Sequence, residues 1–424
     1  MNTTSDVLTR EQYVPIIFWV VVLAVPIALI MVVYLVAIGW GTDLIWETLP
    51  GTLFPGLDRR IYTILVATLG GLLVGVVMRF LGHAGHKTLQ QELTEEGRVE
   101  YRGTLGLLVG AIVGLSSGAS LGPEGPLAHM GGGIATWLAE RRKYPVESKR
   151  VLSLSGIASV FGGYIGTPIG GAFLSIEFTG LLRFPLYGNL IAGTLAGLVG
   201  FLIIQTVSNY SLAGLYHFPD PGLQPIYHLY AVGLGLVGVL HAFAFKYVSG
   251  ATKRLAAPLQ KWPVLKTMIG GFVFGLIGAF LPLTLFSGES ELEEIIEHSA
   301  EIGLAMLLVL SVVKLFTLSV CLQTGFPGGF IFPILFSAGA LGAAINLALP
   351  IIPLTVAMLC VMAGVGGALM RLPFSIVMLL SLLTAPDFAP FLIVSALTGF
   401  LIATFVQAGN ARSTYQEAAA KGRS

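Results

Sequence analysis

The stretch "SSGASLGPEGPLAHMGGG" at residues 116–133 combines features that membrane segments ordinarily avoid. It is rich in glycine, contains two prolines and one carboxylate, Glu124, and has long apolar stretches on both sides. Glycine and proline interrupt helices, and a carboxylate at membrane depth is costly without a partner or a water-filled cavity. The stretch therefore predicts a break between two helices inside a membrane protein, with Glu124 at the break.

The composition of the whole chain supports a membrane protein. Of its 424 residues, 55% are hydrophobic and only 11% are charged, whereas about a quarter of a soluble domain is charged. The formal net charge of +1 gives no reason to expect a nucleic acid as partner. The two cysteines, Cys321 and Cys360, lie in apolar stretches, so we predict no disulfide framework, metal site or cofactor. We expect an all-α polytopic membrane protein.

Apolar runs of about 20 residues, enough to cross a bilayer, mark the expected spans. They lie at 14–39, 61–81, 185–206, 226–249, 264–286, 302–322, 351–370 and 388–407. The first run is too long for a signal peptide and lacks a cleavage-like site after it, so we expect it to be a retained span. Shorter apolar pieces at 104–121, 127–139, 150–162, 168–182, 329–349 and 372–384 indicate tilted, half-spanning or re-entrant helices packed inside the protein.

Charged residues lie mostly between these runs and predict the topology. Basic residues cluster at 141–150 and 246–266, and an acidic segment follows at 288–301. The positive-inside rule places both basic loops in the cytoplasm and the acidic segment outside, where we interpret it as a solvated loop. We expect a multi-pass protein of the plasma membrane, which in a bacterium is the inner membrane.

The polar stretch at 207–225 divides the chain into halves of similar length. We predict a cytoplasmic tail at 1–13, a first membrane half at 14–206, a connecting loop at 207–225, a second membrane half at 226–410 and a short C-terminal segment at 411–424. Each half contains one glycine-rich break, "GPEGP" from residue 122 and "GFPGGFIFP" at 325–333. Interrupted hydrophobic segments at corresponding positions of two halves point to the binding site of a transporter.

A helix that starts in mid-membrane presents unpaired N–H groups and the positive end of its dipole at the break. An anion is the natural partner for these donors, and glycines let the backbone approach it closely. The carboxylate of Glu124 can occupy the same place, so an anion must displace it or it must be protonated and move. The alternative is that Glu124 caps its own helix at an interface. The candidate anion-binding residues are Gly122, Pro123, Gly125 and Pro126 at the first break and Gly328, Gly329, Phe330 and Ile331 at the second.

These segments resemble the CLC family of chloride channels and chloride/proton exchangers. "GPEGPLAHMGG" is similar to the family's G-[RK]-E-G-P motif, and "GFPGGFIFP" to its G-x-F-x-P region. "GGAFLSIEFTG" at 170–180 is similar to the segment after the family's G-x-P turn, and "ARSTYQEA" near the C-terminus to its last helix. The order and spacing also fit, and the resemblance covers roughly residues 15–417.

The resemblance implies a CLC-like fold of two inverted halves with tilted, broken and re-entrant helices, in a homodimer with one ion path per subunit. It implies that Glu124 is the external gate, that the N–H groups of Phe330 and Ile331 line a central anion site, and that Tyr415 supplies a hydroxyl from the inner side. Because the chain stops soon after Tyr415, we expect no regulatory domain. The implied partners are chloride or another small anion and the lipid bilayer.

The chain departs from the family pattern in three places. "GHAGHKTLQ" at 82–90 stands where the family has G-S-G-I-P, so His86, Lys87 or Thr88 would replace the central serine. Pro123 replaces the basic residue before the gating glutamate.

The third departure concerns proton coupling. Family exchangers have a second glutamate after the one that matches Glu177, and here that position is Phe178. Glu177 could line a water path or bond to neighbouring backbone. We therefore expect channel-like anion transport, and the alternative is an antiporter that also carries protons.

Two other function classes have some support in the sequence. "GLSSG" at 114–118 matches G-x-S-x-G, and His129 follows, as an intramembrane serine hydrolase with Ser116 as nucleophile would need. Glycine-rich membrane sequences produce this pattern easily by chance, so we do not expect an enzyme. Intramembrane acids usually line cation paths, which is the argument for a cation or organic-solute carrier. Lys314, in mid-span, would pair with a buried carbonyl or carboxylate, or alternatively raise the potential for an anion.

Overall fold

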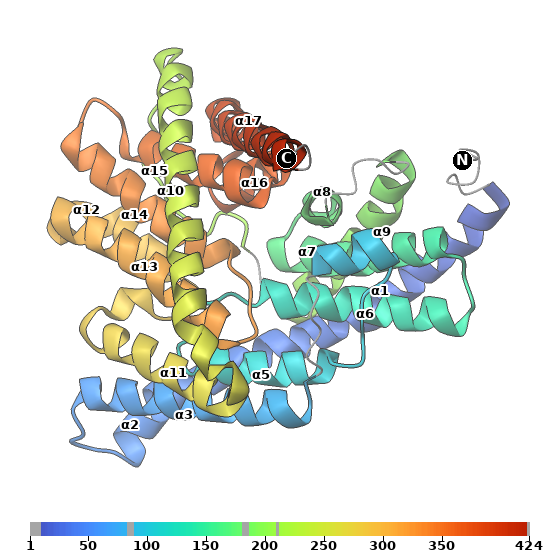
Figure 1. Cartoon of the computed structure of the whole chain (residues 1–424), viewed down its shortest axis with the longest axis horizontal. Coiled ribbons are helices and arrows are strands. Elements are labelled where there is room, and N and C mark those ends of the chain that lie inside the picture. Colours follow the sequence, from blue (N-terminus) through green and yellow to red (C-terminus); the bar gives the residue numbers. More distant parts are fainter. Residues whose placement is uncertain (1–9, 83–88, 180–185, 209–211, 422–424) are drawn as a thin grey trace.

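The computed structural model describes residues 10–82, 89–179, 186–208 and 212–421, and the side chains at 10–12, 178–179, 186 and 408–421 fall outside this description. Within these ranges the chain is helical, and β-pairing occurs only as an isolated bridge between Gly122 and Gly329. We divide the helices by chain order into two groups, α1 to α9 and α10 to α17, and Figure 1 shows α2 and α3 of the first group beneath α11 of the second.

The first group is built from helices of very different length. A long helix opens it and a long helix closes it, with short and broken helices between them. They are α1 (Arg10–Asp43), α2 (Leu49–Thr52), α3 (Arg59–Phe80), α4 (Leu89–Gln91), α5 (Thr104–Ser116), α6 (Glu124–Arg141), α7 (Val146–Ile165), α8 (Pro168–Thr179) and α9 (Leu186–Val207).

The second group follows a similar order. It consists of α10 (Ile226–Ala256), α11 (Pro263–Phe280), α12 (Glu291–Ile302), α13 (Leu304–Thr324), α14 (Ile331–Ala348), α15 (Leu354–Val365), α16 (Pro373–Leu383) and α17 (Ala389–Lys421). The long α1 corresponds to α10, and α6 and α14 both have 18 residues and both begin at a glycine-rich break. The two halves therefore share a long first helix and an 18-residue helix that starts at a glycine-rich break.

The halves meet closely along α3 and α11, which lie side by side (Figure 1). Gly71 and Gly271 make this approach possible. A Cβ at Gly71 would lie 2.4 Å from the carbonyl oxygen of Thr267, and one at Gly271 would lie 2.2 Å from that of Ala67. Larger residues at either position would separate the halves, because side-chain atoms would have to enter the partner backbone.

Eight helical segments of the described chain are long and apolar enough to cross a membrane, so the protein is a multi-pass membrane protein. Seven of the predicted spans coincide with these segments. The prediction for 351–370 is wrong, because this run is the short α15 followed by a π-helical turn at Gly366–Met370. The prediction of a short piece at 329–349 is also wrong, because Ile331–Ala348 is long and apolar enough to span. Hydropathy could not separate two adjacent apolar runs of nearly equal length.

The acidic segment is a helix and not the predicted loop. In α12 the side chains of Leu292, Ile295, Ile296 and Ser299 are buried, while Glu294 and Glu297 are exposed. The buried positions follow the spacing i, i+3, i+4 and i+7, which is the pattern of an amphipathic helix. The segment is thus packed against the protein along one face, and its first residues are held in a fixed position.

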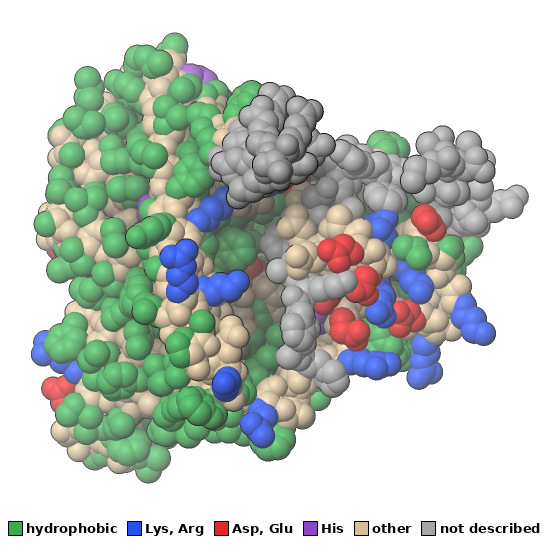
Figure 2. All heavy atoms as spheres, in the orientation of Figure 1, with side chains coloured by type: hydrophobic (Ala, Val, Ile, Leu, Met, Phe, Trp, Pro, Cys, Tyr) green, Lys and Arg blue, Asp and Glu red, His purple; other side chains and the backbone are tan. Residues whose placement is uncertain are grey.

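Charge is unevenly distributed over the surface. In Figure 2 acidic and basic side chains gather on the right, near α6 and α7, whereas hydrophobic side chains cover most of the left. Exposed apolar residues on α1, α3 and α10, such as Phe18, Leu69 and Leu240, suit contact with lipid. The charged region contains the basic segment at 141–150 that the positive-inside rule assigns to the cytoplasm.

Candidate functional site

The two glycine-rich breaks meet in the middle of the protein. Gly122 donates its N–H to the carbonyl of Gly329 at 2.9 Å, and Gly329 returns a hydrogen bond to Gly122 at 2.7 Å. Both residues precede a helix start, α6 at Glu124 and α14 at Ile331. The bridge therefore holds two helix N-termini, one from each half, beside each other.

The carboxylate of Glu124 lies at this junction. Its Oε1 accepts a 2.7 Å hydrogen bond from the backbone N–H of Ile331, at the start of the helix in the other half. The side chain is only 3% exposed. Its second oxygen, Oε2, is buried and has no hydrogen-bond partner within the described residues. The carboxylate thus occupies a position where the second helix start presents a donor to an anion.

Two glycines provide the space for this carboxylate. A Cβ added at Gly122 would lie 1.9 Å from Oε2 of Glu124, and a Cβ added at Gly329 would lie 2.2 Å from its Cδ. A Cβ at Gly125 would lie 2.8 Å from the carbonyl oxygen of Gly328. These positions must lack side chains for the two breaks and the carboxylate to fit together.

The residues around the bridge shape both helix starts. Pro123 is the N-cap of α6, and Pro126 lies in the first turn, where its missing N–H leaves no intrahelical hydrogen bond unmade. Phe330 is the N-cap of α14, so the N–H of Ile331 belongs to the unpaired donors of that helix. Both helix dipoles have their positive ends near the carboxylate.

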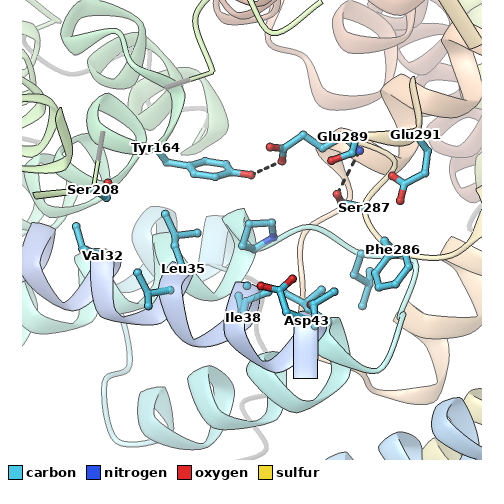
Figure 3. A pocket seen from close by; sticks show the side chains of 17 residues that line it. Val32, Leu35, Ile38, Asp43, Tyr164, Ser208, Phe286, Ser287, Glu289 and Glu291 are labelled. Carbon is cyan, nitrogen blue, oxygen red and sulfur yellow. Dashed lines mark hydrogen bonds between the residues drawn. The ribbon is translucent and has the colours of Figure 1, made fainter. Parts of the chain in front are cut away.

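An open cavity of about 850 Å³ lies on one side of the junction, and we call it the outer cavity. Its lining includes Leu121 and Pro123, directly before Glu124, and the apolar face of α1. Figure 3 shows Tyr164 pointing across it toward Glu289, to whose Oε2 the Tyr164 hydroxyl donates at 2.8 Å. The charged groups among its described lining residues are all acidic: Asp43, Glu289 and Glu291.

Lys314 secures the segment that leads to Glu289 and Glu291. The ammonium is fully buried and donates to the carbonyl oxygens of Thr284, Leu285 and Phe286 at 3.2, 2.8 and 2.9 Å. It also lies 4.8 Å from the centre of the Phe336 ring. The prediction that Lys314 pairs with buried carbonyls is confirmed.

A second cavity, of about 300 Å³, lies on the other side of the junction, and we call it the inner cavity. Among the described residues it is lined by Gly125 and Pro126, next to Glu124, and by the titratable residues Glu92, Glu100 and His129. Arg98 links this wall to the last turn of α6 through a 3.1 Å ion pair with Glu140. That turn leads into the basic segment at 141–150, which the positive-inside rule assigns to the cytoplasm.

The carboxylate of Glu177 bonds to the backbone of another helix. It accepts hydrogen bonds from the N–H groups of Phe374 and Ser375 and from the Ser375 hydroxyl, at 3.3, 2.8 and 2.5 Å. It therefore caps the N-terminus of α16 (Pro373–Leu383).

Five further candidate residues fall outside the description. His86, Lys87 and Thr88 lie in the segment 83–88, which the structure does not describe. Phe178 lies in α8 and Tyr415 in α17, but their side chains are outside the described residues.

Sequence reasoning missed three residues near the junction. Tyr34 of α1 is 2% exposed, its hydroxyl has no hydrogen-bond partner within the described part of the chain, and it interacts electrostatically with Glu124. The ring of Tyr164 packs edge-on against Phe332 in the first turn of α14, with 6.0 Å between centroids. Glu289 belongs to the segment interpreted as a solvated loop. Tyr34 carries the only hydroxyl side chain of the apolar run 14–39, which was a signal for it, whereas nothing local marked the other two.

The residues of the hydrolase alternative have other partners. The Ser116 hydroxyl donates to the carbonyl of Ile38 at 3.2 Å, and Nδ1 of His129 lies 3.2 Å from the Thr104 hydroxyl. A nucleophile and its base should be within hydrogen-bond reach of each other, so this geometry gives the hydrolase no support.

Comparison with known proteins gives consistent matches. The sequence model of a family described as "Voltage gated chloride channel" matches residues 69–408. The "Putative ion-transport protein YfeO" of Escherichia coli O17:K52:H18 is 30% identical over 356 residues, covering 81% of this chain and 82% of the relative. The protein of the same description in Shigella sonnei is 31% identical with the same coverage.

Two solved structures show the same fold. A slow cyanobacterial Cl⁻/H⁺ antiporter aligns with a TM-score of 0.77 at 17% identity, over 92% of this chain and 94% of its own. A CLC-type fluoride/proton antiporter aligns with a TM-score of 0.73 at 19% identity, over 94% and 97%.

Proposed function

Because the chain belongs to the voltage-gated chloride channel family, as its motifs predict, we propose that it carries small monovalent anions, such as chloride, across the membrane through the junction of α6 and α14, with Glu124 as the gate. Members of this family transport ions, and membership supports anion transport as the general function of this chain. The main observation in favour of Glu124 as the gate is the hydrogen bond from the Ile331 N–H to its carboxylate, because this bond holds a negative group at two helix starts.

The hydrogen bond between Ile331 and the Glu124 carboxylate explains how a proton or an anion would open the gate. A charged carboxylate forms a charge-assisted hydrogen bond with the Ile331 N–H, worth roughly 1.5–3 kcal/mol. A protonated carboxyl loses most of this stabilisation, so the side chain moves away from the Ile331 N–H more readily. An anion then binds the donors that Glu124 has vacated. The dipoles bind it without a full positive charge, which lets it leave again.

Two features support channel-like transport without a fixed proton ratio. Phe178 cannot carry a proton, and it stands where family exchangers have their inner glutamate. The neighbouring Glu177 is already bound to the N-terminus of α16. Its carboxylate thus has a capping role that accounts for its burial.

Proton-coupled exchange is the second candidate, and the inner cavity favours it. Glu92, Glu100 and His129 line a space that reaches Gly125, the residue after the gate. Titratable groups around such a cavity could deliver protons from the cytoplasmic side by another route. The two solved structures with the same fold are described as antiporters, which adds weight to this candidate.

Flux measurements on the purified protein in liposomes test the proposal and separate the two modes. Liposomes loaded with potassium chloride are diluted into impermeant anion, and chloride efflux and proton movement are recorded with the voltage set by valinomycin. We expect chloride efflux, little potassium or sodium flux, and no uphill proton movement driven by the chloride gradient. Proton pumping in a fixed ratio to chloride would establish the exchanger, and equal cation flux would refute anion transport.

Glu124→Gln tests the gate, because the amide imitates the protonated carboxyl. We expect the variant to conduct anions with little pH dependence, while the wild type is activated by acid. Glu301→Gln, at an exposed position near the end of α12, is the matched control and should keep the wild-type profile. A folded Glu124→Gln protein with an unchanged pH profile would refute the gate.

A further inference from the structure

The outer cavity contains a second carboxylate in a built position. Glu289 accepts a hydrogen bond from the Tyr164 hydroxyl at Oε2, its backbone N–H donates to the Ser287 hydroxyl at 3.2 Å, and its carbonyl accepts from the Tyr216 hydroxyl at 2.9 Å. Three hydroxyls therefore fix one residue on the wall of the cavity (Figure 3).

Tyr164 connects Glu289 with the gate. Its ring is 1% exposed and packs against Phe332, next to the Ile331 that bonds Glu124. Its hydroxyl emerges from this packing into the outer cavity and binds Glu289. The same side chain thus touches the anion junction with its ring and the cavity carboxylate with its hydroxyl.

The outer cavity forms most of a path from Glu289 toward Glu124, which is not itself among the lining residues. Its lining runs from Glu289 to Leu121 and Pro123, the residues directly before the gate. The charges of Glu289 and Glu124 interact. Because Oε2 of Glu124 is buried without a hydrogen-bond partner among the described residues, it is an available acceptor for a proton at the end of that path.

We propose that Glu289 exchanges protons with Glu124 from the outer solution, and that Tyr164 positions it for this role. A proton from outside binds the Glu289 carboxylate. The O–H bond of Glu289 then breaks, the proton passes through cavity water to Oε2 of Glu124, and Glu289 is again a carboxylate. The inference rests on the proposed gate at Glu124 and adds a named residue to its outer side.

The other acidic groups near Glu289 do not share its contact with Tyr164. Glu291 is electrostatically paired with the buried Lys314, and Asp43 is exposed at the rim of the cavity. Burial, with the nearby acidic residues, raises the pKa of Tyr216 well above its ordinary value, so its hydroxyl stays a donor. The titratable and charged groups around Glu289 are Tyr164 on α7, Tyr216 before α10, Glu291 and Glu293 on α12, Lys314 on α13, Asp43 on α1 and Glu124 on α6.

The test compares acid activation of anion flux in liposomes for Glu289→Gln and for the control Glu294→Gln, whose exposed side chain lies five residues further along the chain on α12. Without the negative neighbour, Glu124 holds its proton less firmly, so the activation midpoint should move about one pH unit toward acid. After a jump to acidic pH outside, activation should also be several-fold slower. Glu289→Asp keeps a carboxylate, so it should restore most of the wild-type midpoint and activation rate. If the effects of Glu289→Gln came only from lost packing, aspartate would not restore them.

Two further variants make the outcome decisive. Tyr164→Phe keeps the ring on Phe332 and removes the hydroxyl, so it should slow activation in the wild type and add nothing to Glu289→Gln. In the Glu124→Gln background, Glu289→Gln should leave the pH profile unchanged. If Glu289→Gln and Glu294→Gln have the same midpoint and rate while wild-type flux depends on Glu124, the role of Glu289 is refuted and the gate stands. If Glu124→Gln itself keeps the wild-type profile, the gate fails first.

Discussion

Gly329→Ala tests whether the closed gate depends on the space beside the bridge. The added Cβ would lie 2.2 Å from Cδ of Glu124 and 2.4 Å from its Oε1, far inside normal contact. Gly329 is not among the glycines with positive φ in the described chain, so alanine suits its backbone. The methyl group and the carboxylate cannot share this space, and the flexible carboxylate is the group that can move.

The size of the effect follows from the hydrogen bond that is lost. Oε1 would no longer reach the Ile331 N–H, which now donates at 2.7 Å. A charge-assisted hydrogen bond of this kind is worth roughly 1.5–3 kcal/mol. Since 1.4 kcal/mol corresponds to a tenfold change in an equilibrium constant, the conformation in which Glu124 accepts from Ile331 should become about 10- to 100-fold less populated. Anion flux at neutral pH should rise toward that of the Glu124→Gln variant.

A double-mutant cycle in liposome flux assays isolates this effect. Glu124→Ala removes the carboxylate, so adding Gly329→Ala in that background should change flux less than about twofold. Size-exclusion profiles in detergent control for folding. Wild-type flux and pH dependence in Gly329→Ala would refute the argument. So would loss of flux in both backgrounds, because the methyl group would then be blocking the anion.

Three other substitutions test the surroundings of the site. Lys314→Met leaves three carbonyls without their shared donor, at about 1–3 kcal/mol for each unsatisfied group, so its unfolding temperature in detergent should be clearly lower than that of an exposed control, Lys253→Met. Glu177→Ala removes the cap of α16, which should lower stability by about 1 kcal/mol while the ratio of proton to chloride movement stays unchanged in the flux assay. Burial raises the pKa of Glu92, so the folded chain binds this proton more tightly, and the resulting stability is present below the ordinary pKa and lost as pH rises through the raised one. Glu92→Gln should therefore flatten the fall in unfolding temperature that occurs as pH rises above the ordinary glutamate range, and an unchanged slope would contradict it.

The two breaks could be predicted from the sequence because their chemistry is local. Glycines, prolines and a single carboxylate inside an apolar chain point to helix starts near Glu124 and near Phe330, and the structure has helices beginning at Glu124 and Ile331. The hydrogen bond that joins them spans 207 positions of the chain. The sequence placed the two ends in one site only through the argument that corresponding breaks meet.

The choice between neighbouring spans and the residues around the junction depended on tertiary contacts, which hydropathy cannot reveal. Which of the runs 329–349 and 351–370 spans is decided by packing around α15, which is buried along its whole length. Tyr164 and Glu289 are 125 residues apart, and neither belongs to a recognisable motif. The periodicity of α12 was present in the sequence, but the density of glutamates led to its interpretation as a loop.

The glycine bridge has a consequence for how large a motion transport needs. Many secondary transporters expose their site alternately by rocking one half against the other. Here the two halves are joined by a pair of backbone hydrogen bonds at the site itself. Rocking them apart would leave four buried peptide groups unpaired, at about 1–3 kcal/mol each. Each ion would then cross a barrier set by the rotation of one side chain, and the scaffold around it would remain stationary throughout the cycle.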